Sequence, residues 1–201
     1  MTRRTSWLSW GSLAVCMAIA GYWLARELDS SNVALASGTW LPAPRELGSF
    51  ALTDQSGAPF TQSQLKGAPS LVFFGFTNCP DVCPGTLLKL AQARRAAALP
   101  GLRVVFVTVD PARDTPALLA QYVHAFDSDF IALTGSAAQI AALAQRFGVA
   151  FERVELPGGG YTMDHSATVF LLDRQGRIAA VFTPPLDAQQ LAGDLRRAAR
   201  S

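Results

Sequence analysis

Short apolar runs alternate with amphipathic segments along most of this chain. Residues 71–76 and 104–109 are continuous apolar runs, rich in aromatic and β-branched side chains and bounded by turn residues, which predicts two buried strands. Between and after these runs, apolar residues recur every three or four positions, which predicts helices. Strands that alternate with helices in this way are typical of a parallel α/β core.

The predicted helices have recognisable ends. A proline in the first turn, a Ser–Gln capping box, an N-terminal aspartate and a glycine after the last turn each favour a helix boundary. These signals bound helices at 84–99, 116–126, 137–147 and 188–201.

Further strands complete the pattern. They are expected near 50–52, 130–133, 151–155, 168–172 and 178–182. The last two are joined by Asp173–Gly176, a hairpin signal, and therefore add antiparallel strands to the parallel core. The chain thus predicts an α/β fold with a central mixed β-sheet flanked by helices.

The chain divides into three expected parts. Residues 1–25 contain two arginines and then an uncharged run of about 20 residues, roughly 30 Å long as a helix, with aromatic residues near both ends. We interpret this part as a cytoplasmic tip followed by one N-terminal transmembrane helix. The alternative is a cleaved signal peptide, for which residues 18–20 provide a small-x-small site. Residues 26–47 are expected to be a linker, and 48–201 the folded domain.

The arginines predict the orientation of this anchor. Arg3 and Arg4 precede the apolar run, and basic residues tend to stay on the cytoplasmic side of a membrane. We therefore expect a single-pass protein of the inner (cytoplasmic) membrane, with its C-terminal domain in the periplasm or otherwise outside the cytoplasm.

The net charge and the number of cysteines limit the classes of function that are possible. The net charge is only +2 and no clustered basic face is evident, which argues against a nucleic-acid partner. Of the three cysteines, Cys16 lies in the N-terminal apolar run, so Cys79 and Cys83 form a pair within the expected domain. A pair with no other thiol nearby is better interpreted as reactive or ligating than as a structural staple.

Cys79 and Cys83 occupy the turn between the strand at 71–76 and the next helix. The dipole at a helix N-terminus favours anions, so both thiols are expected to ionise more easily than free thiols. Thiolates bind soft metals and also attack disulfides. The spacing therefore leaves two possibilities, a metal site and a redox-active catalytic pair.

A histidine distant in the sequence is the candidate third ligand. His165 lies in an expected polar loop before the strand at 168–172, and this loop reaches the thiol turn if that strand neighbours 71–76. Two thiolates and one imidazole suit copper and, geometrically, zinc. The alternative is a loop histidine exposed to water.

Three aspartates are candidates for supporting the site. Asp164 is expected to orient His165 through a hydrogen bond. Asp81, between the cysteines, is expected to bias their pKa values or to hold the turn. Asp110 ends a strand at the carboxyl edge of the sheet, where ligands usually collect. An aspartate at a strand end, such as Asp110, is also an ordinary turn or cap residue.

Three motifs, in this order, resemble those of the Sco/SenC family. They are Phe73–Pro84, Val109–Pro116 and Asp164–Ser166, and the resemblance extends from about Leu47 to the end of the chain. It implies a thioredoxin-like fold that binds copper, as Cu(I), Cu(II) or both.

The resemblance also implies ligands and partners. The family's copper ligands correspond to Cys79, Cys83 and His165. Family members deliver copper to the binuclear copper centre of cytochrome c oxidase subunit II, or reduce its cysteines. We therefore expect that subunit as a partner, together with a copper donor and a thiol-reducing thioredoxin-like protein.

Of these two functions we favour the metallochaperone. The alternative is a thiol–disulfide oxidoreductase that keeps the oxidase copper-site cysteines reduced, with Cys79 or Cys83 as the attacking sulfur. Such enzymes usually have two residues between their cysteines and a proline before the facing strand. Here three residues separate the cysteines, and no proline follows His165 before its strand.

Overall fold

The computed structural model describes Met17, residues 19–22 and residues 34–199. Met17 and residues 19–22 are helical. They belong to a unit that covers the first 34 residues, distinct from the compact unit Leu35–Arg200. Most of the expected membrane anchor therefore lies outside the described residues. Within the part that is described, no helix has the length and hydropathy needed to cross a membrane.

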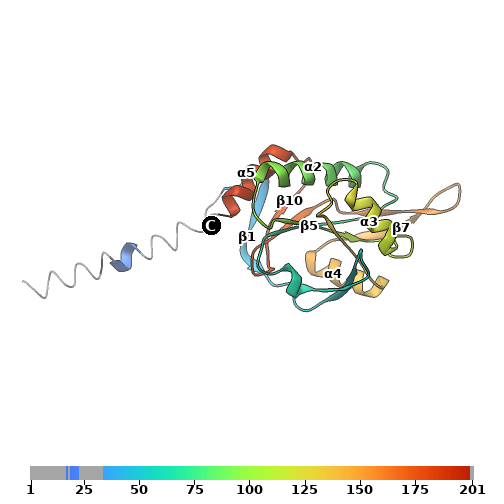
Figure 1. Ribbon diagram of the computed structural model, residues 1–201, viewed down its shortest axis with the longest axis horizontal. Helices are drawn as coiled ribbons and strands as arrows, with labels where there is room; N and C mark the ends of the chain where they lie inside the picture. The colour runs from blue at the N-terminus through green and yellow to red at the C-terminus, as the bar shows by residue number, and fades with distance from the viewer. Residues whose placement is uncertain (1–16, 18, 23–33, 200–201) are drawn as a thin grey trace, which may run out of the picture. The chain divides into compact units, whose positions relative to one another are not determined.

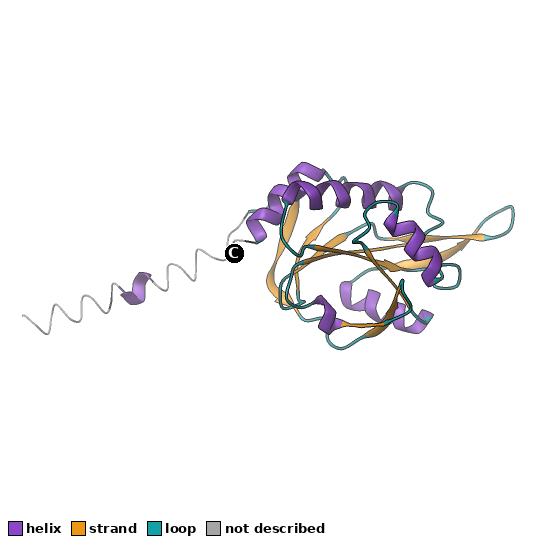
Figure 2. Ribbon diagram, viewed as in Figure 1, coloured by secondary structure: helices purple, strands orange, loops and turns teal. Residues whose placement is uncertain are grey.

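The compact unit is built on one mixed sheet of eight strands (Figure 2). The strand order is β1-β10-β9-β4-β5-β6-β2-β3, and a separate two-stranded sheet is formed by β7 and β8. Parallel pairing joins β4 to β5 and β5 to β6, whereas the other neighbours are antiparallel. The strands are β1 (Gly38–Arg45), β2 (Ala51–Asp54), β3 (Pro59–Thr61), β4 (Ser70–Gly75), β5 (Arg103–Thr108), β6 (Ile131–Thr134), β7 (Phe151–Glu155), β8 (Tyr161–His165), β9 (Val169–Leu172) and β10 (Ile178–Phe182).

Helices cover both faces of the large sheet. Helices α2 and α5 pack together on one face, and α4 lies on the opposite face (Figure 1). The helices are η1 (Gln62–Leu65), α2 (Val82–Ala97), α3 (Pro116–His124), α4 (Ala137–Phe147) and α5 (Ala188–Ala198). The mixed sheet between helical layers confirms the predicted α/β class.

Strand β4 lies at the centre of the core. All six of its residues are buried. Successive side chains of a strand point to opposite faces, so Phe73 contacts Phe106 on the face of α2 and α3, while Phe74 packs edge-on against Phe147 of α4 at 5.1 Å between ring centroids. Burial on both faces explains why this strand has a continuous apolar sequence.

The helix boundaries follow the capping signals closely. Ser136 and Gln139 form the predicted capping box of α4, and Gly148 ends that helix in the left-handed conformation. Helix α2 begins at Val82, two residues before the expected start at Pro84. Proline is tolerated anywhere in the first turn, where its missing N–H has no helical partner to lose. As a result, Cys83 belongs to the helix rather than to the turn.

The structure corrects the expected linker at 26–47. Residues Gly38–Arg45 form β1, which pairs with β10 at the edge of the sheet. Pro42 and Pro44 favoured a linker in the sequence, but an edge strand needs backbone donors on only one side and therefore accepts proline. The chain before β1 is also fixed, because the backbone N–H groups of Ala36 and Ser37 donate to the carboxylate of Asp194 at 2.7 and 2.8 Å.

Candidate metal centre

The two cysteines lie where β4 leads into α2. Cys79 is half-buried in the turn, and Cys83 is the second residue of α2 and fully buried. The backbone N–H of Cys79 donates to the carbonyl of Phe76 at 3.3 Å, and that of Cys83 donates to Sγ of Cys79 at 3.4 Å. These bonds close the turn and hold both sulfur atoms at the start of the helix.

The third candidate ligand comes from the β7–β8 hairpin, which extends from the body of the domain (Figure 1). His165 is the last residue of β8, and its Nε2 lies 3.3 Å from Sγ of Cys83. The sequence predicted a loop here, but the segment is a strand that pairs with β7. The expectation about the next strand is confirmed, since β9 pairs directly with β4.

The surroundings of His165 favour a neutral imidazole whose unprotonated nitrogen, Nε2, is directed toward the thiols. The ring makes edge contacts with Phe73 and Phe76, at 6.0 and 5.8 Å between ring centroids. Nδ1 lies 3.1 Å from the carbonyl oxygen of Ser166, so we place the N–H on Nδ1, which leaves the lone pair on Nε2. Burial lowers the pKa of His165 and favours the neutral imidazole, the form that binds metals.

These three residues form a metal-binding arrangement. The ligand atoms of Cys79, Cys83 and His165 all lie within 4.8 Å of one another, and no other such group of His, Cys, Asp and Glu occurs among the residues that the structure describes. Two sulfur atoms and one imidazole nitrogen at this separation fit a single ion of soft or borderline character, copper above all. A closed structural zinc site would normally have a fourth protein ligand.

One electrostatic expectation is wrong for Cys83. The helix N-terminus was expected to make both thiols more acidic, but burial raises the pKa of Cys83, and the neighbouring sulfur of Cys79 raises it further. Loss of hydration outweighs the backbone hydrogen bond at Phe76, which lowers the pKa, because Cys83 faces the core rather than solvent. A metal ion that binds here must therefore displace the proton of Cys83.

The side chains of two of the expected supporting aspartates form no hydrogen bond with the three ligand residues. Asp81 is exposed at the N-terminus of α2, and its side chain makes no capping hydrogen bond. Asp164 is exposed on β8, and Nδ1 of His165 is directed to the carbonyl of Ser166 instead. The expected hydrogen bond between Asp164 and His165 is thus absent from the described structure, although the negative charge of Asp164 opposes the lowering of the His165 pKa.

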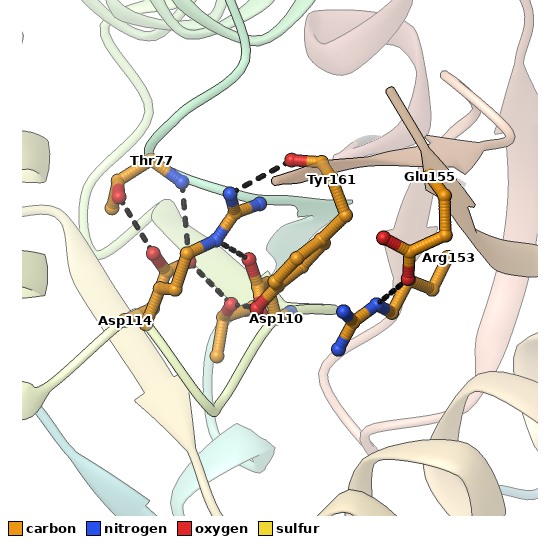
Figure 3. A network of polar contacts seen from close by, with 8 residues as sticks. Thr77, Asp110, Asp114, Arg153, Glu155 and Tyr161 are labelled. Carbon is orange, nitrogen blue, oxygen red and sulfur yellow. Dashed lines mark hydrogen bonds and ion pairs between the residues drawn. The ribbon is translucent and has the colours of Figure 1, made fainter. Parts of the chain in front are cut away.

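Asp110 is buried but is directed to the hairpin rather than to the sulfur atoms. Its carboxylate accepts a hydrogen bond from the hydroxyl of Tyr161 at 2.9 Å and forms an ion pair with Arg113 (Figure 3). Arg113 also donates to the carbonyl of Tyr161 at 2.9 Å. Asp110 therefore supplies no ligand atom to the three-residue group. Its contacts with Tyr161 and Arg113 connect β8 to the segment that follows β5.

The structure adds a residue that sequence reasoning did not single out. Asp114 is buried and accepts hydrogen bonds from the backbone N–H of Thr77 at 3.1 Å and from its hydroxyl at 2.6 Å (Figure 3). The hydroxyl of Thr108 is a further donor. Burial raises the pKa of Asp114, and these hydrogen bonds oppose that shift. Its only sequence signal is its place in the Val109–Pro116 motif.

Comparison with known proteins gives consistent matches. The model of the family described as SCO1/SenC matches residues 41–200. A SCO2-like protein of Rickettsia prowazekii is 38% identical over 148 residues, which cover 72% of this chain and 72% of that protein.

Solved structures agree with these sequence matches. The crystal structure of Arabidopsis thaliana ScoI with copper bound has a TM-score of 0.73 and 31% identity, over 76% of this chain and 97% of that one. Bradyrhizobium japonicum ScoI with copper bound has a TM-score of 0.69 and 40% identity, over 75% of this chain and 98% of that one. The domain therefore has a thioredoxin-like α/β fold, and the chain belongs to the SCO1/SenC family.

Proposed function

We propose that this protein is a copper metallochaperone that binds one copper ion through Sγ of Cys79, Sγ of Cys83 and Nε2 of His165. The observation that carries the proposal is the 3.3 Å separation of the imidazole nitrogen from the sulfur of Cys83. Thiolate ligands select soft Cu(I), and imidazole also suits Cu(II), so the same set serves either oxidation state. The copper-bound relatives from Arabidopsis and Bradyrhizobium support this choice of metal.

The geometry also suits release of the ion. Cys79 and His165 are only half-buried, so the ligands of a partner protein can approach the copper from their side, while Cys83 is enclosed. Three protein ligands leave room for an incoming thiolate, which allows transfer by stepwise ligand exchange. Copper is thus cargo on this protein rather than a permanent cofactor.

The proposed recipient is the binuclear copper site of cytochrome c oxidase subunit II, as the family resemblance implies. The copper must come from a donor, and the thiols must be kept reduced in a compartment that oxidises them, which requires a thiol-reducing thioredoxin-like partner. In this proposal the N-terminal apolar run anchors the domain to the inner membrane, with the domain on the periplasmic side.

A titration and a transfer assay test the proposal. The reduced full chain is titrated with Cu(I) against a competing chelator and then mixed with the copper-free soluble domain of subunit II. We expect one equivalent of copper to bind and to pass to that domain. Cys79→Ser and Cys83→Ser should abolish tight binding and His165→Ala should weaken it sharply, whereas His124→Ala, which removes an exposed histidine of α3, should match the parent.

The second candidate function is reduction of the oxidase cysteines. In its favour, Cys79 is the more exposed thiol, so a disulfide of a partner protein can reach its sulfur, and Cys83 lies next to it to complete the exchange. In this reaction Cys79 would attack the disulfide of subunit II and Cys83 would then close the Cys79–Cys83 disulfide, which leaves two thiols on the partner. If copper-free His165→Ala reduces the oxidised domain as fast as the parent, and the parent transfers no copper, this function replaces the first.

A further inference from the structure

The sulfur and imidazole halves of the site come from separate parts of the fold. The thiols follow β4, whereas His165 ends a two-stranded hairpin that is not part of the large sheet. We propose that the turn Asp110–Thr115 fixes the position of His165 relative to the two thiols. In this turn, Asp114 binds the thiol turn and Asp110 binds the hairpin. The expected effect of this turn on copper affinity rests on the function proposed above, whereas its effect on the position of His165 does not depend on that function.

The thiol half is held by one buried carboxylate. Asp114 receives both the backbone N–H and the hydroxyl of Thr77, and Thr77 lies two residues before Cys79 in the turn. The hydroxyl of Thr108, at the end of β5, is bonded to the same carboxylate. Because three donors converge on one enclosed group, the start of the thiol turn has little freedom to move relative to β5.

The imidazole half is held at the far end of its strand. The hydroxyl of Tyr161 donates to Asp110, and the guanidinium of Arg113 donates to the carbonyl of Tyr161 while lying 3.8 Å from the centre of its ring. Tyr161 and His165 are four residues apart on β8 and therefore share one face of it. The pairing of β8 with β7 runs without a bulge from Tyr161 to His165. Because the hairpin is regular over this length, a fixed position of Tyr161 also fixes the position of His165.

The two carboxylates are fixed to each other within the turn. The backbone N–H groups of Arg113 and Asp114 both donate to the carbonyl of Asp110, at 3.2 and 3.0 Å. The N–H of Asp110 is bonded in turn to the hydroxyl of Thr108. A single compact turn thus contacts both halves of the site, and Figure 3 shows Thr77 next to Asp114 and Tyr161 next to Asp110. We identify Thr77, Asp110, Arg113, Asp114 and Tyr161 as positioning residues, none of which supplies a ligand atom to the three-residue group.

The chain provides a matched control for the hairpin contact. Arg153 lies over the ring of Tyr161 at 3.8 Å, the same distance as Arg113. Its hydrogen bond is to Glu155, which is also on β7, and not to the turn. Arg153→Gln therefore removes a cation from the same aromatic ring without touching the link between hairpin and turn.

Copper affinities in two backgrounds test the proposal. The variants Tyr161→Phe, Thr77→Val, Thr77→Ser and Arg153→Gln are made in the parent chain and in His165→Ala, and each is checked for folding by urea unfolding. Tyr161→Phe should weaken Cu(II) binding about three- to tenfold in the parent, as loss of one positioning hydrogen bond does, and should have no effect once His165 is absent. Thr77→Val should weaken binding in both backgrounds, because the thiols remain, whereas Thr77→Ser and Arg153→Gln should match their parents.

A copper-free measurement separates this proposal from the previous one. Proton NMR contacts between the ring of His165 and that of Phe76 should weaken in Tyr161→Phe and stay unchanged in Arg153→Gln. If the parent binds no copper, the proposed function fails while these contacts still decide the positioning. The positioning proposal is overturned if the contacts are the same in Tyr161→Phe and the parent, or if Tyr161→Phe weakens copper equally with and without His165.

Discussion

Nε2 of His165 lies 3.3 Å from Sγ of Cys83, although 82 positions separate the two residues in the chain. The antiparallel pairing of β9 with β4 produces this contact, because it sets Val169 at the start of β9 opposite Phe73 near the end of β4. The chain that enters β9 therefore passes the turn that leaves β4. The site is a consequence of sheet order, and each of the following predictions depends on the packing around it.

Copper affinity should increase with pH. Burial raises the pKa of Cys83, so this thiol keeps its proton at neutral pH and must release it when copper binds. The apparent association constant should therefore rise by at least about tenfold per pH unit between about pH 6 and pH 8. Competition against a chelator of known proton affinity, repeated across this range, measures the slope. An affinity that is flat with pH would show that Cys83 is already ionised or is not a ligand.

The copper-free protein should lose stability in mild acid because of His165. Burial lowers the pKa of His165 in the folded domain, whereas the unfolded chain takes up a proton near pH 6.5. The unfolded state therefore binds more protons, and stability falls as the pH drops below about 6.5, until the folded ring is protonated too. Urea unfolding at about pH 7.5 and pH 5.5 should show a smaller pH effect in His165→Gln than in the parent.

His124→Gln is the matched control for that experiment, since it removes the exposed imidazole of α3 and leaves the site intact. It should retain the pH effect of the parent. Equal pH effects in His165→Gln and the parent would contradict the buried, neutral state of His165.

A methyl group at Gly75 should damage both stability and copper binding. A Cβ there would lie 2.8 Å from Sγ of Cys83 and 2.8 Å from Cε2 of Phe106, and both of these side chains are fully buried. Overpacking of this kind costs about 1–3 kcal/mol, and relief of the clash would move Cys83 away from His165. Urea unfolding and copper titration of Gly75→Ala measure the two effects.

Gly85→Ala is the control, because a Cβ at Gly85, in the first turn of α2, would meet no atom within 4 Å beyond its chain neighbours and the backbone of its own helix. Alanine favours a helix over glycine by up to about 1 kcal/mol, so this variant should equal or exceed the parent in stability. If Gly75→Ala is as stable as Gly85→Ala and binds copper like the parent, the sulfur of Cys83 does not lie where the structure has it.

The segment before β1 should detach in Asp194 variants, in a pH-dependent way. Burial alone would raise the pKa of Asp194, but hydrogen bonds from Ala36, Ser37 and Arg197 outweigh it, and the pKa lies below its usual value. The carboxylate therefore stabilises the fold above about pH 4 and loses this effect as acid protonates it. Asp194→Asn should lower the free energy of unfolding by about 1–3 kcal/mol at pH 7 and by less near pH 3. An equal decrease in the free energy of unfolding at both pH values would show that the substitution acts through packing alone and not through the charge of Asp194.

The thiol half of the site could be predicted from the sequence because its signals are local. The apolar run of β4, the turn and the proline in the first turn of α2 lie within about 15 consecutive residues, and the structure differs by only two residues in the start of α2. Cys79 and Cys83 follow from that pattern without knowledge of the rest of the fold.

The remaining features depend on contacts that are distant in the chain. β8 is short and polar and is stabilised by its pairing with β7 and by Arg113, so its sequence was interpreted as a loop. Asp114 lies 37 residues from Thr77, and nothing in the local sequence connects the two. The raised pKa of Cys83 depends on how deeply the first turn of α2 is buried, which only the packed structure reveals.

Copper K-edge X-ray absorption of the loaded, reduced protein shows directly which atoms bind the copper ion. We expect two sulfur ligands and one imidazole nitrogen around each copper ion, with the imidazole signal lost in His165→Ala and kept in His124→Ala. A shell of sulfur alone, identical in the parent and in His165→Ala, would contradict a site built from Cys79, Cys83 and His165.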